Sequence, residues 1–350
     1  MKILFLYRNS RLFQQNVISK IPNEFLFGSN FLINSYKLEM LNKNKNSQYF
    51  FFKLVERFFS LFTRIGLPFD YLIDNKNKIN KFDTIICSND PLSLVILFGK
   101  KIKILKKDLN IICIFQSLAQ RQESYFKYNF FFKKLISSLV KENYKILTLS
   151  DNAKNYINKN IYKSNIHVLK FGIDQNFWKY KEYYFENRNY ILSIGNDMNR
   201  DFETLIKANK DRYRIIIITN KKIKSNYPYR QISNLTNEEV REYFYKARFT
   251  IIPSKELIYE TSGLSSILQS MACGTPVISS YSDALGEYFS NDIDIKFFKS
   301  GDLIQLREMI KYSWEDYNLL RKLSFNAQTL VRNKYNSFNM SKELKKIIDK

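Results

Sequence analysis

Short apolar runs that alternate with longer helical patterns are the feature that most restricts the fold of this 350-residue chain. Each run has the length of a strand that is buried on both faces. The alternation therefore predicts an α/β protein, with parallel sheets covered by helices on both sides. In the first half, strands are expected at 3–7, 84–87, 110–115, 145–149 and 166–169, with helices such as 130–142 and 151–158 between them.

The alternation stops after Trp178 and starts again at Tyr190, which predicts two Rossmann-like domains. Residues 179–189 are charged, rich in tyrosine and without clear periodicity, so we expect a linker there. The expected divisions are an N-terminal domain over 1–178, a second domain over 190–332, and a C-terminal helix over 333–350 that packs back on the first domain. Because ligands bind beyond the carboxyl ends of parallel strands, two such domains facing across a cleft favour an enzyme with two substrates.

The expected elements of the second domain follow the same rhythm. Strands are predicted at 190–194, 214–219, 249–253 and 276–280, and helices at 201–208, at 237–246, from Gly263 and from Asp302 onward.

The charge balance favours anionic partners. The chain has 56 Lys and Arg against 33 Asp and Glu, a formal net charge of +23. Phosphate-bearing substrates and an anionic membrane surface are candidate partners. The basic residues are scattered and no nucleic-acid-binding motif is present, so nucleic acid is not expected. With a single histidine, His167, and three separated cysteines, we expect no metal and no cofactor.

The N-terminal apolar run is too short for a signal peptide, and no apolar stretch of about 18 residues is present. We expect a cytoplasmic protein, which could rest peripherally on the inner face of the membrane. Two aromatic and basic stretches, 49–65 and 125–134, bear on this choice. The first places Phe51, Val55, Phe58, Phe59 and Phe62 on one helical face. Such faces either lie on an anionic interface or pack into the core, and both interpretations stay open.

The most informative segment is 253–278. A strand ends at Pro253, a polar loop follows, and Thr261-Ser262-Gly263 opens a helix that is expected to end at Gly274. Free backbone N–H groups at the start of that helix form an anion site, and Gly263 allows a ligand to approach closely.

This segment resembles the donor-binding signature of the family-4 group of retaining GT-B glycosyltransferases. The run Met-Ala-Cys-Gly-Thr-Pro-Val-Ile over 271–278 carries the resemblance. The family usually has two glutamates eight residues apart here, the second of which holds the ribose of the nucleotide. In this chain the second position is Gln269 and the first is Thr261, with Glu260 one residue earlier. Gln269 can still hydrogen-bond a ribose hydroxyl, without charge. Glu260 either contacts the donor or is a carboxylate favoured at a helix N-terminus.

A second match lies at 190–205, where a strand ends in Gly195 and a polar turn leads into a helix. This arrangement resembles the phosphate loop of the same family. Asn196 replaces the usual arginine, and Arg200 aligns with the usual lysine that holds the donor diphosphate. Arg200 could instead be a solvated loop cation paired with Asp201.

The first domain matches less closely. Lys170-Phe171-Gly172-Ile173-Asp174 resembles the segment that closes the first domain of the family, but the region 8–80 resembles it least. Arg8 to Arg11 replace a frequent glycine pair, and Gln116-Ser117 replace a frequent histidine. His167 lies in an apolar strand and is expected to be structural.

The resemblance implies a retaining, metal-independent hexosyltransferase that moves a sugar from a nucleotide-sugar to a glycan or lipid-linked acceptor in cell-surface polysaccharide synthesis. The alternative is a catalytically inactive GT-B subunit that binds a glycan or a partner. The implied site has three parts: catalytic Arg200 and Glu260; donor-binding Gly195, Asn196, Asp197, Arg200, Thr219, Asn220, Ser254, Thr261, Ser262, Gly263, Leu264 and Gln269; and acceptor-binding Arg8, Ser10, Asn89, Gln116 and Ser117.

Overall fold

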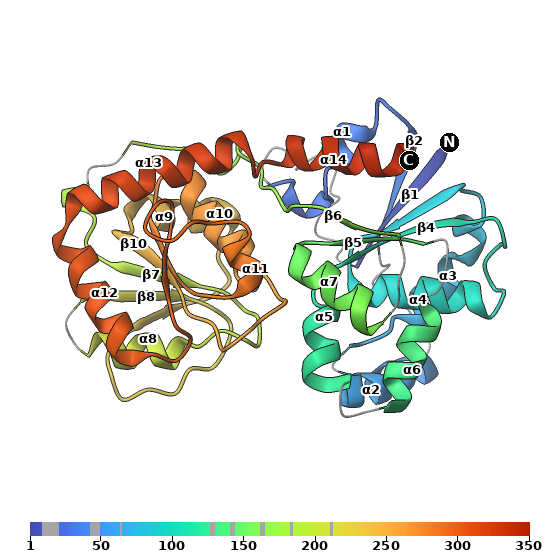
Figure 1. Cartoon of the computed structure of the whole chain (residues 1–350), viewed down its shortest axis with the longest axis horizontal. Helices are drawn as coiled ribbons and strands as arrows, with labels where there is room; N and C mark the ends of the chain where they lie inside the picture. The colour runs from blue at the N-terminus through green and yellow to red at the C-terminus, as the bar shows by residue number, and fades with distance from the viewer. Residues whose placement is uncertain are drawn as a thin grey trace. The chain divides into compact units, whose positions relative to one another are not determined.

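The computed structural model describes the chain except residues 9–20, 43–49, 64, 127–129, 141–143, 162–164, 183–184 and 211–212. It divides into two compact units (Figure 1). The first comprises Met1–Ile18, Phe25–Lys170 and Met340–Lys350; the second comprises Ser19–Glu24 and Phe171–Asn339. The main division thus falls after Lys170, whereas the sequence placed the end of the first domain at Trp178.

The first unit contains a six-stranded parallel sheet in the order β2-β1-β3-β4-β5-β6. Its strands are β1 (Lys2–Tyr7), β2 (Lys37–Asn42), β3 (Thr84–Cys87), β4 (Asn110–Phe115), β5 (Lys145–Thr148) and β6 (Asn165–Val168). Its helices are α1 (Ser29–Leu32), α2 (Phe50–Thr63), α3 (Phe69–Ile79), α4 (Asp90–Lys101), α5 (Leu118–Arg121), the π-helix η4 (Gln122–Phe126), α6 (Phe130–Leu139) and α7 (Asp151–Asn160). The short 3-10 helix η3 (Glu24–Leu26) begins in the second unit and ends in the first.

The last helix, α14 (Ser337–Asp349), brings the C-terminus into the first unit. Lys145 Nζ on β5 donates to the carbonyl of Ile347 at 2.9 Å. Gly28 lies so close to Ser341 that an added Cβ would come within 2.7 Å of the Ser341 Cα.

The second unit has its own six-stranded parallel sheet, in the order β12-β11-β10-β7-β8-β9. The strands are β7 (Ile191–Ile194), β8 (Ile215–Ile218), β9 (Arg230–Ile232), β10 (Phe249–Ile252), β11 (Val277–Ser280) and β12 (Lys296–Phe298). The helices are η5 (Phe185–Asn187), α8 (Phe202–Asn209), α9 (Asn237–Lys246), α10 (Leu264–Ala272), α11 (Asp283–Gly286), α12 (Leu303–Glu315) and α13 (Tyr317–Asn333). The two sheets confirm the predicted α/β class.

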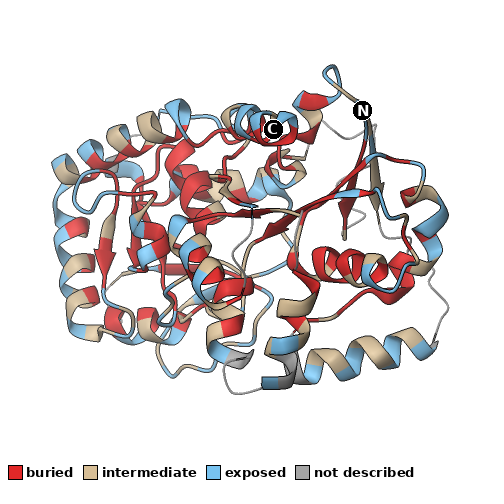
Figure 2. Ribbon diagram, turned by 45° about the vertical axis from the view of Figure 1, so that its right-hand side comes forward, coloured by how far each residue is buried: buried red, intermediate tan, exposed pale blue. Residues whose placement is uncertain are grey.

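Local sequence explains where these elements begin and end. β8 is four consecutive isoleucines, all buried, and β-branched side chains favour a strand. Thr236 and Glu239 form a capping box at the start of α9. Gly274 follows α10 with a φ of 78°, a backbone conformation that glycine adopts at little cost. Figure 2 shows the strands of both sheets as largely buried, so each sheet is the centre of its own hydrophobic core.

The segment that the sequence analysis predicted as a linker packs on the second unit. An added Cβ at Gly274 would lie 2.6 Å from the ring of Tyr180, and Arg188 Nη1 donates to the Gly274 carbonyl at 3.1 Å. The three cysteines, Cys87, Cys113 and Cys273, are buried free thiols.

Candidate functional site

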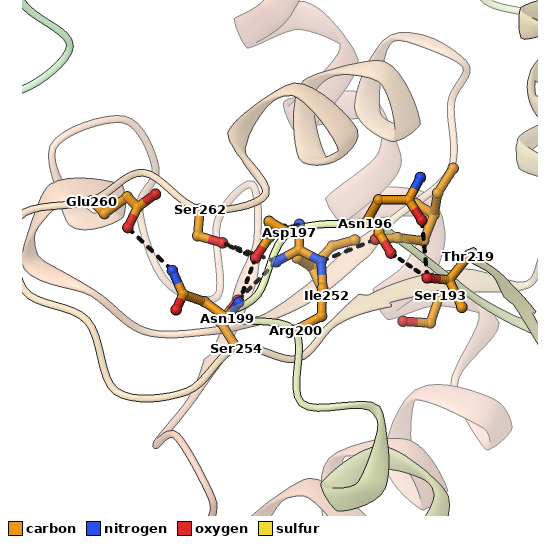
Figure 3. Close-up of polar contacts among 12 residues, drawn as sticks. Ser193, Asn196, Asp197, Asn199, Arg200, Thr219, Ile252, Ser254, Glu260 and Ser262 are labelled. Atoms are coloured by element: carbon orange, nitrogen blue, oxygen red, sulfur yellow. Dashed lines mark hydrogen bonds and ion pairs between the residues drawn. The ribbon is translucent and has the colours of Figure 1, made fainter. Parts of the chain in front are cut away.

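A buried arginine is the centre of the candidate site in the second unit. Arg200 lies in the loop between β7 and α8 and is only 4% exposed (Figure 3). Its Nη1 donates to Ser254 Oγ at 2.9 Å and to Ser262 Oγ at 3.2 Å. Its Nε donates to the Ile194 carbonyl at 3.1 Å, and Nη2 pairs with Asp197 Oδ2 at 3.1 Å. The guanidinium therefore joins its own loop to two serines that lie 54 and 62 residues further along the chain.

Two glycines make room for this guanidinium. Gly195 has a φ of 147° and Gly263 a φ of 89°, both in the region that favours glycine. A Cβ added at Gly263 would lie 2.8 Å from Arg200 Nη2 and 2.5 Å from a methyl group of Ile252. A Cβ added at Gly195 would collide with Arg200 Nε. Gly263, which was predicted to let a ligand approach closely, thus also makes room for the arginine, as does Gly195.

Backbone pairing holds the two loops together. Arg200 and Ser254 form an isolated antiparallel bridge. The Asp201 N–H donates to the Pro253 carbonyl at 3.1 Å, and the Lys255 N–H donates to the Asn199 carbonyl at 2.8 Å. Asn199 Nδ2 also donates to Glu260 Oε2 at 3.1 Å. The loop after β7 and the loop after β10 therefore form one structure at the carboxyl ends of neighbouring strands, where α/β sheets bind ligands.

Two carboxylates balance the buried charge. Burial lowers the pKa of Arg200, whereas the nearby charges of Asp197 and Glu260 act in the opposite direction. Asp197 Oδ1 accepts a hydrogen bond from Ser262 Oγ at 3.0 Å, so the same side chain serves both the arginine and the start of α10. The sequence alternative, in which Arg200 is a solvated cation paired with Asp201, is wrong, because Arg200 is buried and pairs with Asp197.

A second polar cluster joins the ends of β7 and β8. Thr219 Oγ1 lies 2.7 Å from the Gly195 carbonyl and 3.1 Å from Asn196 Oδ1. The Asn220 N–H donates to Asn196 Oδ1 at 2.7 Å. Lys221 Nζ donates to the Asp197 carbonyl at 3.1 Å and is partly exposed. Lys221 was not predicted from the sequence, although a cation three residues after β8, the strand next to β7, is a usable signal.

The N-terminus of α10 is a candidate anion-binding site. Gly263 is its N-cap and has no side chain to offer, so no side-chain cap is present. The Leu264 N–H donates to the Thr261 carbonyl at 3.0 Å, and the following amides of the first turn have no partner within the helix. Thr261 and Ser262 are buried beside them. First-turn amides without a helical partner and the helix dipole both favour negative charge.

Gln269 lies further along α10. Its Nε2 donates at 3.0 Å to Oε1 of Glu24, a buried residue that the sequence analysis did not single out. The structure thus brings together the predicted donor residues from Gly195 to Leu264. Gln269 lies on the helix that begins at Leu264, but its side chain bonds Glu24 and none of these residues.

The predicted acceptor residues lie in the first unit. Asp90 accepts from the Gln116 N–H at 2.7 Å and from Ser117 Oγ at 2.8 Å, and Asn89 caps α4 directly before it. Burial raises the pKa of Asp90. These three predicted residues therefore meet at the ends of β3 and β4. Arg8 follows β1 and pairs with Glu56 at 2.7 Å. Ser10 lies outside the described residues.

His167 takes no part in either cluster. It is half-buried on β6, its Nε2 lies 2.6 Å from Asn165 Oδ1, and burial lowers its pKa. In the described part of the chain, no three His, Cys, Asp or Glu side chains are arranged to hold a metal ion.

Much of this site lies in a segment that matches a known family model. Residues 199–346 match the family model described as "Glycosyl transferase-like". This part of the chain is therefore similar to glycosyl transferase-like proteins. No curated protein matches the chain.

Solved structures with the GT-B fold are similar to this chain over its whole length. The structure of HepE from Anabaena in complex with UDP and glucose has a TM-score of 0.72 at 10% identity, covering 100% of this chain and 99% of that one. Sucrose-phosphate synthase from Thermosynechococcus elongatus has a TM-score of 0.73 at 13% identity, with coverage of 100% and 98%. A glycosyltransferase from Rickettsia africae gives 0.66 at 15% identity, covering 99% and 97%. The GT-B fold expected from the resemblance is confirmed.

Proposed function

We propose that this protein moves a hexosyl group from a nucleotide-sugar to a glycan or lipid-linked acceptor, with retention of configuration, in cell-surface polysaccharide synthesis. The observation that carries the proposal is the junction of the Gly195 loop, the Ser254 to Gly263 loop and the start of α10 around Arg200. This junction lies largely in the part of the chain that matches the family model. The structures of HepE, which hold UDP with glucose or UDP-glucose, support a nucleotide-sugar as the donor.

The donor diphosphate binds at the start of α10 in this proposal. Arg200 is paired to protein groups, so it acts by its fixed charge and by holding the loops. Lys221, which is partly exposed, contacts the phosphates directly. Glu260 contacts the transferred sugar and Gln269 the ribose. Asn196, Thr219 and Asn220 shape the adjoining wall of the donor site.

The acceptor binds at the first unit, at Arg8, Ser10, Asn89, Gln116 and Ser117. None of these five side chains is a carboxylate or an imidazole, so in this proposal the departing diphosphate accepts the proton of the acceptor hydroxyl while the new glycosidic bond forms. Fixed cations and helix amides stabilise the charge that develops on the leaving group, so the transfer needs no metal ion and no cofactor.

A lipid-linked acceptor is supported by the face of α2. Phe51, Leu54, Phe58 and Leu61 are exposed at helical spacing, and the exposed cations Lys53 and Arg57 lie among them. The five apolar residues that were predicted to share one face of this helix therefore do not all face solvent. Phe51 and Phe58 are exposed, whereas Val55 and Phe59 are half-buried and line an apolar cavity; the side chain of Phe62 lies outside the described residues.

Beneath α2 lies a cavity of about 270 Å³ lined by apolar side chains of α2, α3, α4, α6 and residues 65–67. Exposed aromatics with cations suit an anionic membrane surface, and the cavity offers room for hydrocarbon. No described helix is long and apolar enough to cross a bilayer. We therefore propose a cytoplasmic protein on the inner face of the membrane.

The alternative function is a catalytically inactive subunit that binds a glycan or a partner. It is supported by the contacts of two residues that were predicted to bind the donor: Arg200 and the amide nitrogen of Gln269 already bond protein groups. Turnover of any nucleotide-sugar rejects it.

The first experiment is a thermal-shift screen with UDP, GDP, ADP and their common sugar conjugates. One nucleotide and its conjugate are expected to raise the unfolding midpoint, since a ligand of the folded state stabilises it. Lys221→Ala is expected to reduce the shift, and Lys222→Ala, at an exposed neighbouring lysine, to leave it unchanged. The absence of any shift with a folded sample contradicts the proposed function.

A further inference from the structure

A carboxylate from the N-terminal part of the chain is enclosed in the second unit. Glu24 is fully buried. Its Oε1 accepts from Trp178 Nε1 at 2.9 Å and from Gln269 Nε2 at 3.0 Å, and its Oε2 accepts from the Asp174 N–H at 3.4 Å. A buried charge is retained only where such partners satisfy it.

These three partners are all N–H donors, so Glu24 acts here as an acceptor only. That fixes the direction of the Gln269 amide, because an amide offers donors on its nitrogen and lone pairs on its oxygen. Nε2 points to Glu24, and Oε1 points away from it. Among the described residues no hydrogen bond to Gln269 Oε1 is found, and this atom is not sealed from solvent.

The position of Gln269 suits the nucleoside part of a ligand. It lies on α10, six residues after Gly263, which is about 9 Å along the helix axis. A ligand whose diphosphate meets the start of α10 can bring its ribose to this side of the helix. A ribose hydroxyl can donate one hydrogen bond, and Gln269 Oε1 is an acceptor for it.

We propose that Glu24 is a positioning residue that turns Gln269 into a dedicated acceptor for a ribose hydroxyl of the donor. This inference rests on the proposed function. It also gives a physical reason for glutamine at position 269: a second carboxylate there would face Glu24 at about hydrogen-bond distance in a buried environment, where like charges repel strongly. Glu24 and Gln269 therefore form one unit, with the carboxyl group on one member and the amide on the other.

A double-mutant cycle tests the pair without any ligand. Gln269→Glu is expected to lower the unfolding midpoint strongly, because it places two carboxylates together. Combining it with Glu24→Gln exchanges the two groups and restores a donor opposite an acceptor. The double variant is expected to recover most of the lost midpoint, and simple addition of the two single effects overturns the pairing.

Ribose recognition tests the role of the pair. UDP, GDP and ADP are each compared with their 2′-deoxy and 3′-deoxy forms. For the nucleotide that binds, the wild type is expected to prefer the ribo form by about three- to tenfold over one deoxy form, as one hydrogen bond allows. Glu24→Gln is expected to remove this preference and to leave the affinity for the deoxy form unchanged. Glu203→Gln, at an exposed glutamate on α8 of the same unit, is the matched control and retains the preference.

The two failures are distinguishable. If the wild type binds none of the three nucleotides, the proposed function is rejected, and the ribose contact with it. If the wild type binds with a ribose preference that Glu24→Gln leaves intact, the proposed function stands and the role of Glu24 is overturned.

Discussion

The guanidinium of Arg200 lies directly against the backbone of Gly263, where a Cβ would come within 2.8 Å of Nη2. This contact joins the loop after β7 to the start of α10. The candidate anion site at the start of α10 therefore depends on the buried guanidinium of Arg200, even if a bound ligand does not contact that guanidinium.

The first prediction concerns that contact. Gly263→Ala is expected to destabilise the protein by about 2–3 kcal/mol or more, through left-handed backbone strain and collision with Arg200 and Ile252. Gly301→Ala is the matched control, since Gly301 has a φ of 78° but nothing within 4 Å of an added Cβ. It is expected to cost only the backbone strain, about 1–2 kcal/mol. Urea unfolding measures both, and equal losses contradict the contact.

The second prediction concerns the charge of Arg200. Arg200→Ala leaves Asp197 without its cation and two serines without their donor, so a loss of about 3 kcal/mol is expected. This loss is at the lower end of the range for breaking a buried ion pair, because the Asp197 side chain is 37% exposed and keeps part of its hydration. Arg321→Ala breaks the exposed pair with Glu186 and is expected to cost at most about 1 kcal/mol. Similar losses for both variants refute the structural role given to Arg200.

The third prediction is a pH dependence of stability. Burial raises the pKa of Asp294 to about 6 from 3.8. The folded state therefore binds more protons than the unfolded state between these values, and this contribution to stability is lost as the pH rises from about 4 to 6. Asp294→Asn is expected to match the wild type at pH 4 and to be more stable at pH 7.5 by about 1 kcal/mol, allowing for solvent screening. Chemical denaturation at both pH values measures the free energy of unfolding of the variant and of the wild type. If the two proteins differ by the same free energy at pH 4 and at pH 7.5, the raised pKa of Asp294 is rejected.

The fourth prediction concerns the exposed face of α2. Phe58→Glu, at a residue that is 57% exposed, is expected to reduce binding to anionic vesicles severalfold. Phe325→Glu, at a residue of α13 that is 70% exposed, is the control and is expected to have no effect. Co-sedimentation with phosphatidylglycerol and with phosphatidylcholine vesicles measures this. Equal binding to both vesicle types, or equal loss in both variants, contradicts the membrane surface.

The fifth prediction concerns metal dependence. Sugar transfer is expected to retain its rate in excess EDTA, because fixed protein charges stabilise the leaving diphosphate. Loss of activity in EDTA that Mg²⁺ or Mn²⁺ restores contradicts this account.

The sequence predicted the buried strands well and the edge strands poorly. β3, β4 and the helix α9 were placed at the observed bounds, because continuous apolar runs and a capping box are local signals. β2 and β9 were missed: their residues are mostly exposed or half-buried, so their pattern is close to that of a loop. β12 was missed because it is only three residues long.

The candidate site was predicted in composition but not in its contacts. Gly195, Arg200, Ser254 and Gly263 were recognised from local motifs, and the structure joins them. That Arg200 is buried and paired depends on a loop more than 50 residues away. The bond between Glu24 and Gln269 spans 245 residues, and no periodicity or spacing in the sequence reports it.

The measurement that most directly tests the central claim is hydrogen exchange of the whole protein with and without a saturating nucleotide-sugar. The account predicts slower exchange of backbone amides in residues 195–200, 219–221 and 261–269 of the second unit, since a bound diphosphate there would order both loops and the start of α10. Protection confined to the first unit, or unchanged exchange in these segments with the ligand bound, would contradict the claim that they form the donor site.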